Sequence, residues 1–161
     1  MIDVFIGIGS NIEPEHHVAA ALAALENRFG SIRTSTIYRS RAVGFDGNDF
    51  LNLVAAFGTD LDVNVLDDEL HRIETDCGRD RSAPRFAPRT IDLDLLLYGD
   101  AVIDEQRLKL PRAEILKYAF VLQPLAELAG DRRHPVTGRT FAEHWRRFDS
   151  DEPPLIAVAA N

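Results

Sequence analysis

Two aspartates stand inside an otherwise apolar segment, residues 88–99 with the sequence PRTIDLDLLLYG. The composition of residues 90–98 predicts a strand, and alternate side chains of a strand share one face. Asp92 and Asp94 therefore point the same way, about 6–7 Å apart along the backbone. Two neighbouring carboxylates need compensating charge, which hard divalent cations such as Mg²⁺ supply through oxygen ligands. With Arg89 directly before the strand, the pair predicts metal-dependent phosphoryl-type chemistry.

A simpler interpretation fits the same spacing. The two aspartates can lie on the solvated face of an edge strand and pair with nearby arginines. The spacing alone leaves both interpretations open.

Arginines gather just before these aspartates. Residues 78–89 contain several arginines together with glycine and proline, a composition that disfavours a helix and predicts an irregular basic loop. Lys109 and Lys117 are the only lysines of the chain, and the preference for arginine favours bidentate contacts with oxyanions. The arginines of this loop are Arg79, Arg81, Arg85 and Arg89.

The bulk composition limits the setting of any such site. A chain of 161 residues that is 45% hydrophobic predicts one domain, residues 1–161, with a peripheral tail from about residue 149. A net charge of −8 argues against nucleic acid as a partner. Cys77 is the only cysteine, and neither a secretory signal nor an apolar span of membrane length is evident, so we expect a reducing, cytoplasmic setting without a membrane partner.

Helix and strand signals alternate along the chain and predict a mixed α and β fold. Pro14 can open the first helix, Asn64 is the expected N-cap of the second, and Pro124 is expected to bend or split the third. Gly9 and Ser10 are assigned to a turn after the first strand. The expected strands cover residues 2–8, 31–40, 49–58 and 90–98, with short extended pieces in 101–111, and the expected helices cover 14–29, 65–77, 113–128 and a short stretch near 140–148.

Several segments, in the same order, resemble the 6-hydroxymethyl-7,8-dihydropterin pyrophosphokinase family of folate biosynthesis. They are GRDRSAPRFAPRTIDLDLLLYGD (78–100), IGIGSNI (6–12), YRSRAVG (38–44), DFLN (49–52) and FVLQPLAEL (120–128). The resemblance implies a ferredoxin-like α+β fold, an antiparallel sheet with helices packed on it, in a monomeric protein. It also implies ATP as co-substrate, two Mg²⁺ ions, and transfer of the terminal diphosphate of ATP to the hydroxymethyl oxygen, with release of AMP.

The resemblance also implies roles for individual residues on the ATP side. Asp92 and Asp94 match the metal ligands, and Arg79 and Arg89 match the catalytic arginines that reach the ATP phosphates from a closing loop. Phe86 stands where that loop usually carries tryptophan. The remaining positions that match the ATP side are His71, Glu74, Arg81, Arg85, Arg107 and Arg112.

On the pterin side, Asn52 matches an asparagine whose amide offers both a donor and an acceptor to the ring. Phe50 and Phe120 match the aromatic pair that sandwiches the ring, and Val43 and Gly44 match the loop beside it. Without the resemblance, Phe50 and Phe120 would be interpreted as core residues and Asn52 as a turn or edge residue.

One segment departs from the family pattern. Arg112 and Tyr118 replace a histidine and an arginine that the family uses around the nucleotide phosphates. Arg112 can still contact a phosphate, but Tyr118 supplies no positive charge. We therefore expect a rearranged ATP side, with altered affinity or nucleotide preference and an unchanged reaction type.

Other reactive residues lack suitable spacing. His16, His17, His134 and His144 show no metal-ligand pattern and are expected at the surface. Cys77 falls at the end of a helix without a histidine partner, which argues against a nucleophile.

Two further hypotheses stay open beside a pterin pyrophosphokinase. One is a divergent paralogue that pyrophosphorylates another pterin alcohol. The other is a non-catalytic module that binds a pterin or a nucleotide.

Overall fold

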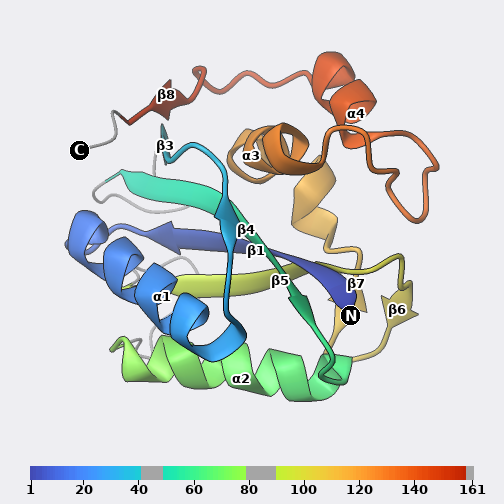
Figure 1. Ribbon diagram of the computed structural model, residues 1–161. Coiled ribbons are helices and arrows are strands. Elements are labelled where there is room, and N and C mark those ends of the chain that lie inside the picture. The colour runs from blue at the N-terminus through green and yellow to red at the C-terminus, as the bar shows by residue number, and fades with distance from the viewer. Residues whose placement is uncertain (41–48, 79–89, 159–161) are drawn as a thin grey trace.

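An antiparallel sheet forms the centre of the molecule in a computed structural model that describes residues 1–40, 49–78 and 90–158. Helices α1 and α2 lie on one side of the sheet, and α3 and α4 lie on the other (Figure 1). The strands run in the order β5-β1-β4-β3-β8, with β2 also paired to β4, and β6 and β7 form a separate two-stranded sheet. The elements are β1 (Ile2–Ser10), α1 (Pro14–Phe29), β2 (Arg33–Thr34), β3 (Tyr38–Ser40), β4 (Phe50–Thr59), α2 (Val63–Asp76), β5 (Asp92–Tyr98), β6 (Ile103–Asp104), β7 (Lys109–Leu110), η1 (Ala113–Leu116), α3 (Ala119–Ala129), α4 (Phe141–Arg147) and β8 (Ile156–Ala157).

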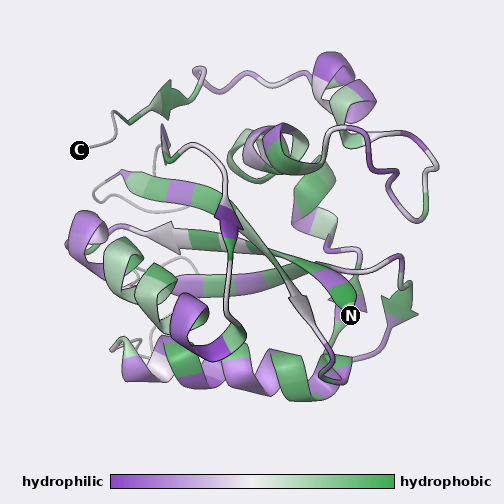
Figure 2. Ribbon diagram, in the orientation of Figure 1, coloured by the Kyte–Doolittle hydropathy of each residue, from purple (hydrophilic) through white to green (hydrophobic). Residues whose placement is uncertain are grey.

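Each face of the sheet has its own apolar core, because alternate residues of β1 and β4 point to opposite sides. Ile6 and Leu53 belong to the core beneath α1 and α2, while Phe5 and Val54 belong to the core beneath α3 and α4. Figure 2 shows hydrophobic and hydrophilic residues alternating along α2, as expected for a helix with one buried stripe. Burial of a leucine-sized side chain contributes about 1.5–3 kcal/mol, so these two cores hold the helices on the sheet.

The predicted elements are found, but several boundaries differ from the prediction: β1 continues to Ser10, and the strand predicted over 31–40 is divided into β2 and β3. Asp62, and not Asn64, is the N-cap of α2, because its extended backbone lets its carboxylate accept the Asn64 N–H at 3.1 Å. The predicted helix over 113–128 is divided at Lys117 and Tyr118 into η1 and α3, and α3 continues through Pro124.

His134 is buried, contrary to the expectation of a surface position. It lies in a short hairpin-like segment in which Arg133 bridges to Thr140. Its Nδ1 accepts hydrogen bonds from the backbone N–H groups of Val136 and Thr137, which leaves the side chain 6% exposed. Burial, together with the neighbouring His144, lowers the pKa of His134, so the neutral ring is favoured as the acceptor.

Strand β3 is held on two sides. On its outer side, the tail returns to the sheet as β8, and the Val158 N–H donates to the Ile37 carbonyl at 2.8 Å. From α3, the Glu127 carboxylate accepts hydrogen bonds from Thr36 N, Thr36 Oγ1 and the Tyr38 hydroxyl at 2.9, 2.6 and 2.9 Å. These contacts fix the strand that leads to Ser40.

No helix in the described parts of the chain combines the length and the apolar character needed to cross a bilayer.

Substitution of Glu127 by Gln tests the attachment of β3 to α3. Burial raises the pKa of Glu127, but the hydrogen bonds from Thr36 and Tyr38 outweigh this effect and hold the pKa below its usual value. The ionised carboxylate therefore stabilises the fold above pH 4.5, the usual pKa, and this contribution is lost as the pH falls through the lowered pKa. We expect Glu127→Gln to lower the free energy of unfolding at pH 7 by about 1 kcal/mol, because the carboxylate is largely exposed.

Urea denaturation at pH 7 and pH 3.5 measures this effect, and the loss should shrink at the lower pH. Glu105→Gln is the matched control, since Glu105 is exposed and its side chain has no partner among the described residues. Equal stability of Glu127→Gln and the unaltered protein at pH 7 would contradict the proposed attachment.

Candidate functional site

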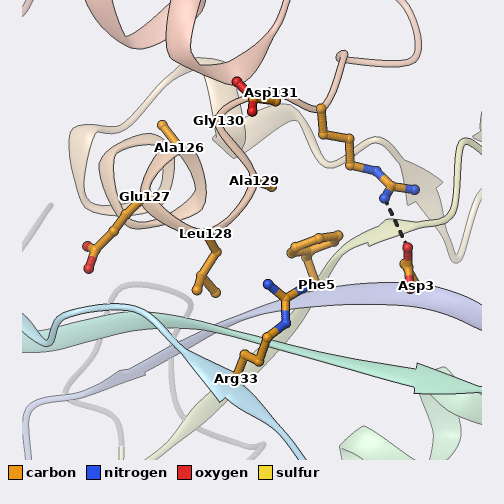
Figure 3. A pocket seen from close by; sticks show the side chains of 10 residues that line it. Asp3, Phe5, Arg33, Ala126, Glu127, Leu128, Ala129, Gly130 and Asp131 are labelled. Carbon is orange, nitrogen blue, oxygen red and sulfur yellow. Dashed lines mark hydrogen bonds and ion pairs between the residues drawn. The ribbon is translucent and has the colours of Figure 1, made fainter.

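Charged residues gather at two places on the face of the sheet that α3 covers, and the first place is a hollow at the C-terminal end of α3. It measures about 470 Å³ and is lined by Phe5, Arg33 and neighbouring residues (Figure 3). Arg132 pairs there with Asp3 at 3.3 Å and lies 5.4 Å from the Phe5 ring centroid. Glu127 is already bound to Thr36 and Tyr38. Because these charged groups are already paired with other residues that hold the fold together, the hollow is the weaker candidate for the functional site.

The second place lies at the other end of the same face, where four residues form a row across four strands. Asp92 of β5 is opposite Gly9 of β1, Gly9 is opposite Asn52 of β4, and Asn52 is opposite Tyr38 of β3. Residues paired directly across neighbouring strands share a face. The sheet register therefore brings together a carboxylate and an amide that lie far apart in the sequence.

The structure confirms that Asp92 and Asp94 share one face of β5. Both are half-buried, and they alternate with Leu93 and Leu95, which lie in the opposite core. Strand β5 is the outermost strand of the sheet, as the simpler interpretation of the aspartates required. The two aspartates are nevertheless not surrounded by solvent alone, because further charged groups lie around Asp94.

Burial raises the pKa of Asp94 to about 6. The guanidinium of Arg112, with Nη2 3.6 Å from Asp94 Oδ1, lowers the pKa, while the charges of Asp92, Glu74 and Glu114 raise it. Among the described residues, the site is therefore a cluster of carboxylates with excess negative charge, an environment in which a bound cation is stabilising.

Arg112 reaches Asp94 because its backbone is fixed to the same strand. Its N–H donates to the Leu96 carbonyl at 3.1 Å, directly after the cis Leu110–Pro111 peptide bond. Its Nε also lies 2.9 Å from Glu114 Oε2. The guanidinium thus lies between two carboxylates.

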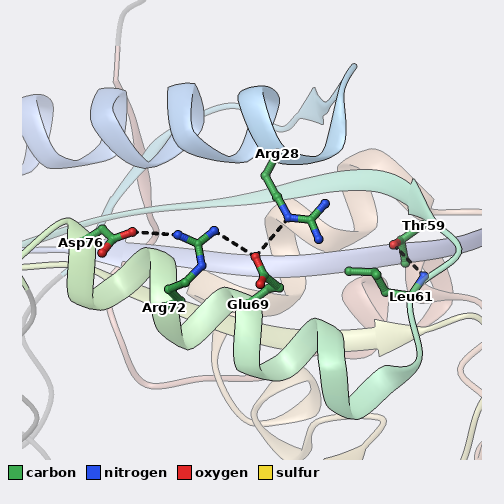
Figure 4. Close-up of polar contacts among 6 residues, drawn as sticks. All are labelled: Arg28, Thr59, Leu61, Glu69, Arg72 and Asp76. Atoms are coloured by element: carbon green, nitrogen blue, oxygen red, sulfur yellow. Dashed lines mark hydrogen bonds and ion pairs between the residues drawn. The ribbon is translucent and has the colours of Figure 1, made fainter.

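Glu74 of α2 anchors β5 between the two aspartates. Its side chain is 1% exposed, and its Oε2 accepts the Leu93 N–H at 2.8 Å. Helix α2 is itself tied to α1, because Glu69 accepts from Arg28 and from Arg72, which also bonds Asp76 (Figure 4). The helix pair therefore holds the edge strand that carries the carboxylates.

Gly7 and Gly9 leave the middle of this face without side chains. Both lie in β1, on the side opposite to the buried Ile6 and Ile8, so Gly9 and Ser10 are not in the predicted turn. A Cβ at Gly9 would lie 2.9 Å from Asn52 Oδ1. The alternation of glycine with isoleucine in IGIGS was the signal for this strip without side chains, and it predicts a strand rather than a turn.

On the amide side, Asn52 is 6% exposed and its Nδ2 donates to Ser40 Oγ at 2.6 Å. Phe50 is half-buried two residues earlier on β4, on the same face. Phe120 is half-buried in the first turn of α3, where its ring stacks on that of Tyr118 with centroids 5.0 Å apart. Tyr118 is thus part of an aromatic pair.

Of the remaining predicted residues, His71 and Arg107 lie on other parts of the fold, and the rest fall outside the described residues. His71 is half-buried on α2, with its Nδ1 3.9 Å from Asp67, and Arg107 is exposed in the turn between β6 and β7. Cys77 is half-buried at the end of α2, and burial, together with the charge of Asp76, raises the pKa of its thiol, which disfavours the thiolate. The residues outside the described ranges are Val43, Gly44, Arg79, Arg81, Arg85, Phe86 and Arg89.

Paired carboxylates beside a buried amide on one face of an antiparallel sheet can hold a cation next to a small polar ligand. Comparison with known proteins specifies the class. A family model described as 7,8-dihydro-6-hydroxymethylpterin-pyrophosphokinase (HPPK) matches residues 5–130. The chain belongs to this pyrophosphokinase family.

Individual relatives agree with this assignment. The 2-amino-4-hydroxy-6-hydroxymethyldihydropteridine pyrophosphokinase of Haemophilus influenzae is 40% identical over 154 residues, covering 89% of this chain and 96% of that protein. The enzyme of the same name from Pseudomonas aeruginosa is 43% identical over 144 residues, covering 87% and 88%. The solved structure of Plasmodium falciparum HPPK-DHPS has a TM-score of 0.73 at 14% identity, over 92% of this chain and 44% of that chain, a likeness that concerns the fold alone.

Substitution of Asp94 by Asn tests the carboxylate cluster in the metal-free protein. Since the pKa of Asp94 is raised from 3.8 to about 6, folding favours its protonated form; the stabilisation is full below pH 4 and is lost as the pH rises through 6. Asn resembles the neutral form at every pH. We expect Asp94→Asn to raise the free energy of unfolding at pH 7.5 by about 1 kcal/mol, a value reduced for solvent screening because the side chain is 41% exposed.

Urea denaturation in EDTA at pH 7.5 and pH 4 measures this difference, which should nearly vanish at pH 4. Asp104→Asn is the control, because Asp104 is 88% exposed and lies in the separate two-stranded sheet of β6 and β7. If Asp94→Asn were less stable than the unaltered protein at pH 7.5, the surroundings of Asp94 would not destabilise its charged form.

Proposed function

We propose that the protein transfers the terminal diphosphate of ATP to the hydroxymethyl group of 6-hydroxymethyl-7,8-dihydropterin and releases AMP, in folate biosynthesis. One observation carries this proposal in a chain of this family: the row from Asp92 over Gly9 to Asn52 on one face of the sheet. The row separates an acidic end from an amide end by two strand spacings, about 10 Å. This span suits a phosphate group at one end and a pterin ring at the other.

We also infer that the fold is ferredoxin-like. In chain order, β1, α1, β3, β4, α2 and β5 follow the pattern βαββαβ, and the corresponding strands lie in the order β5-β1-β4-β3. This order and the antiparallel pairing support the assignment, to which β2, β8, α3 and α4 are additions.

Asp92 and Asp94 are the residues that would hold Mg²⁺, and their surroundings fit this ion. Their ligand atoms are hard carboxylate oxygens in a cluster with excess negative charge. Within the ranges 1–40, 49–78 and 90–158, no three His, Cys, Asp or Glu side chains are grouped so as to hold a metal alone. Mg²⁺ commonly uses one or two carboxylates and completes its shell with waters and substrate phosphates, so the pair suits two ions that arrive with ATP.

When bound, Mg²⁺ neutralises phosphate charge and polarises the phosphorus that is attacked. Arg112 stays a predicted phosphate contact, and the position of its guanidinium beside Asp94, a proposed metal ligand, supports this role. His71, Glu74 and Arg107 stay predicted contacts of the ATP side, as do the arginines and Phe86 of the basic loop.

Asn52 recognises the pterin edge, and Phe50 and Phe120 contribute the apolar faces against which the flat ring stacks. The hydroxymethyl oxygen forms a bond to the β-phosphorus of ATP and gives up its proton to solvent, while the bond from that phosphorus to the α-β bridging oxygen breaks and AMP leaves. Holding both reactants in line on one rigid sheet face lowers the entropic part of the barrier. A monomeric, cytoplasmic enzyme stays a prediction from the sequence.

A second candidate is a paralogue that acts on another pterin alcohol. It is favoured by the stacking of Tyr118 on Phe120, because this pair changes the aromatic surface near the start of α3. A panel of pterin alcohols decides between the two candidates, and a clear preference for 6-hydroxymethyl-7,8-dihydropterin would eliminate the paralogue. Any catalytic turnover would eliminate a non-catalytic binding module.

The direct test mixes purified protein, ATP, Mg²⁺ and 6-hydroxymethyl-7,8-dihydropterin. We expect diphosphorylated pterin with one AMP per product, identified by mass spectrometry and nucleotide chromatography. Asp94→Ala should lower kcat at least about a thousandfold, because it removes charge stabilisation that acts on the transferred group. Circular dichroism of the variant should stay that of a folded protein.

Asp104→Ala serves as the control for Asp94→Ala, since it removes an exposed carboxylate remote from the row. Retained turnover in Asp94→Ala would refute the assignment of the metal ligands. Absence of product with every acceptor, despite pterin binding, would refute the proposed reaction.

A further inference from the structure

We propose that Ser40 is a specificity-determining residue, which positions the Asn52 amide so that the site accepts a 4-oxo pteridine and rejects a 4-amino one. This inference rests on the proposed function, because it assigns a partner to the amide that is to recognise the pterin. Ser40 acts by positioning Asn52 and does not itself contact the reacting atoms.

The first observation is the hydrogen bond between the two side chains. Asn52 Nδ2 donates to Ser40 Oγ at 2.6 Å, and Asn52 is only 6% exposed. Ser40 and Asn52 lie on adjacent antiparallel strands, where Ser40 is paired with Phe50 and Asn52 with Tyr38. The contact is therefore a diagonal one on a single face of the sheet.

The second observation lies on the other side of the amide. Gly9 is the direct partner of Asn52 on β1, and a Cβ at Gly9 would lie 2.9 Å from Asn52 Oδ1. A side chain at this position would collide with the amide, so Gly9 leaves the space that Asn52 occupies. The amide therefore lies between the two strands, with its Nδ2 held by Ser40 on β3 and its Oδ1 toward the backbone of β1.

The third observation is the rigidity of the strand that carries Ser40. Strand β3 is paired with β4 on one side and with β8 on the other, and Glu127 holds Thr36 and Tyr38 just before Ser40. Precise recognition needs groups whose own positions are fixed by such secondary contacts. The C-terminal strand therefore contributes indirectly to the position of the Asn52 amide.

The chemistry of the amide gives the consequence for specificity. With one N–H used on Ser40, Asn52 keeps one N–H donor and an oxygen acceptor for a ligand. The lactam edge of a pterin offers the complement, because N3–H is a donor and the 4-oxo group is an acceptor. In a 2,4-diaminopteridine both are reversed, since N3 accepts and the 4-amino group donates. A positioned amide discriminates between these edges, while an amide free to turn over can bind either.

The experiment compares two ligands that share every other group, 6-hydroxymethylpterin and 2,4-diamino-6-hydroxymethylpteridine. Their dissociation constants are measured by pteridine fluorescence with Mg²⁺ and α,β-methylene-ATP present. Ser40→Val and Ser40→Thr form the decisive pair, because the two side chains have the same shape and only Thr keeps the hydroxyl. Ser40→Ala provides a smaller variant should Val disturb the sheet.

We expect Ser40→Val and Ser40→Ala to bind 6-hydroxymethylpterin about five- to tenfold more weakly, as for the loss of one hydrogen bond. The preference for the 4-oxo over the 4-amino ligand should fall about tenfold, whereas Ser40→Thr should keep it. In steady-state assays the change should appear in KM for the pterin, with kcat nearly unchanged, and the affinity for the ATP analogue should stay the same.

Asn52→Ala separates the failure of this inference from that of the proposed function. If Asn52→Ala abolishes the 4-oxo preference while Ser40→Val and Ser40→Ala keep it, the role of Ser40 is refuted and the pterin site stands. If Asn52→Ala leaves pterin binding unchanged, Asn52 does not recognise the pterin, and both the site assignment and the role of Ser40 are refuted.

Discussion

The central strand β1 must pair with β4 and β5 while leaving one of its faces bare, and the site depends on this constraint. Ile6 and Ile8 fill the core beneath α1 and α2, whereas Gly7 and Gly9 carry no side chain on the other face. Gly9 is buried, and a side chain there would collide with Asn52. The same alternation that builds one core therefore leaves the space in which Asn52 lies beside β1.

Charge in the site works against the stability of the fold. Asp94 is partly buried among like charges, which raises its pKa to about 6, and Arg112 offsets only part of this effect. Two hydrogen bonds hold these charged groups in place. The Glu74 carboxylate accepts the Leu93 N–H of β5, and the Leu96 carbonyl accepts the Arg112 N–H. Such an arrangement favours the binding of cations, because metal ions relieve a repulsion that is already present.

The sequence predicted the elements of the fold and the position of the carboxylate pair, because both follow from local periodicity. The strand alternation of residues 90–98 placed Asp92 and Asp94 on one face, and the structure confirms it. The row from Asp92 to Tyr38 could not be predicted, because register depends on pairing between strands far apart in sequence. Glu74 on Leu93 and Ser40 on Asn52 were missed for the same reason. His134 was placed at the surface because nothing local reveals the backbone N–H groups that bury it.

The two departures from the family pattern act on different groups of the site. Arg112 brings a guanidinium to Asp94 and Glu114, where it lowers the pKa of Asp94 against the surrounding carboxylates. Tyr118 stacks on Phe120 and so adds aromatic surface at the start of α3. Positive charge thus lies beside the carboxylates, while position 118 contributes a ring to the aromatic pair.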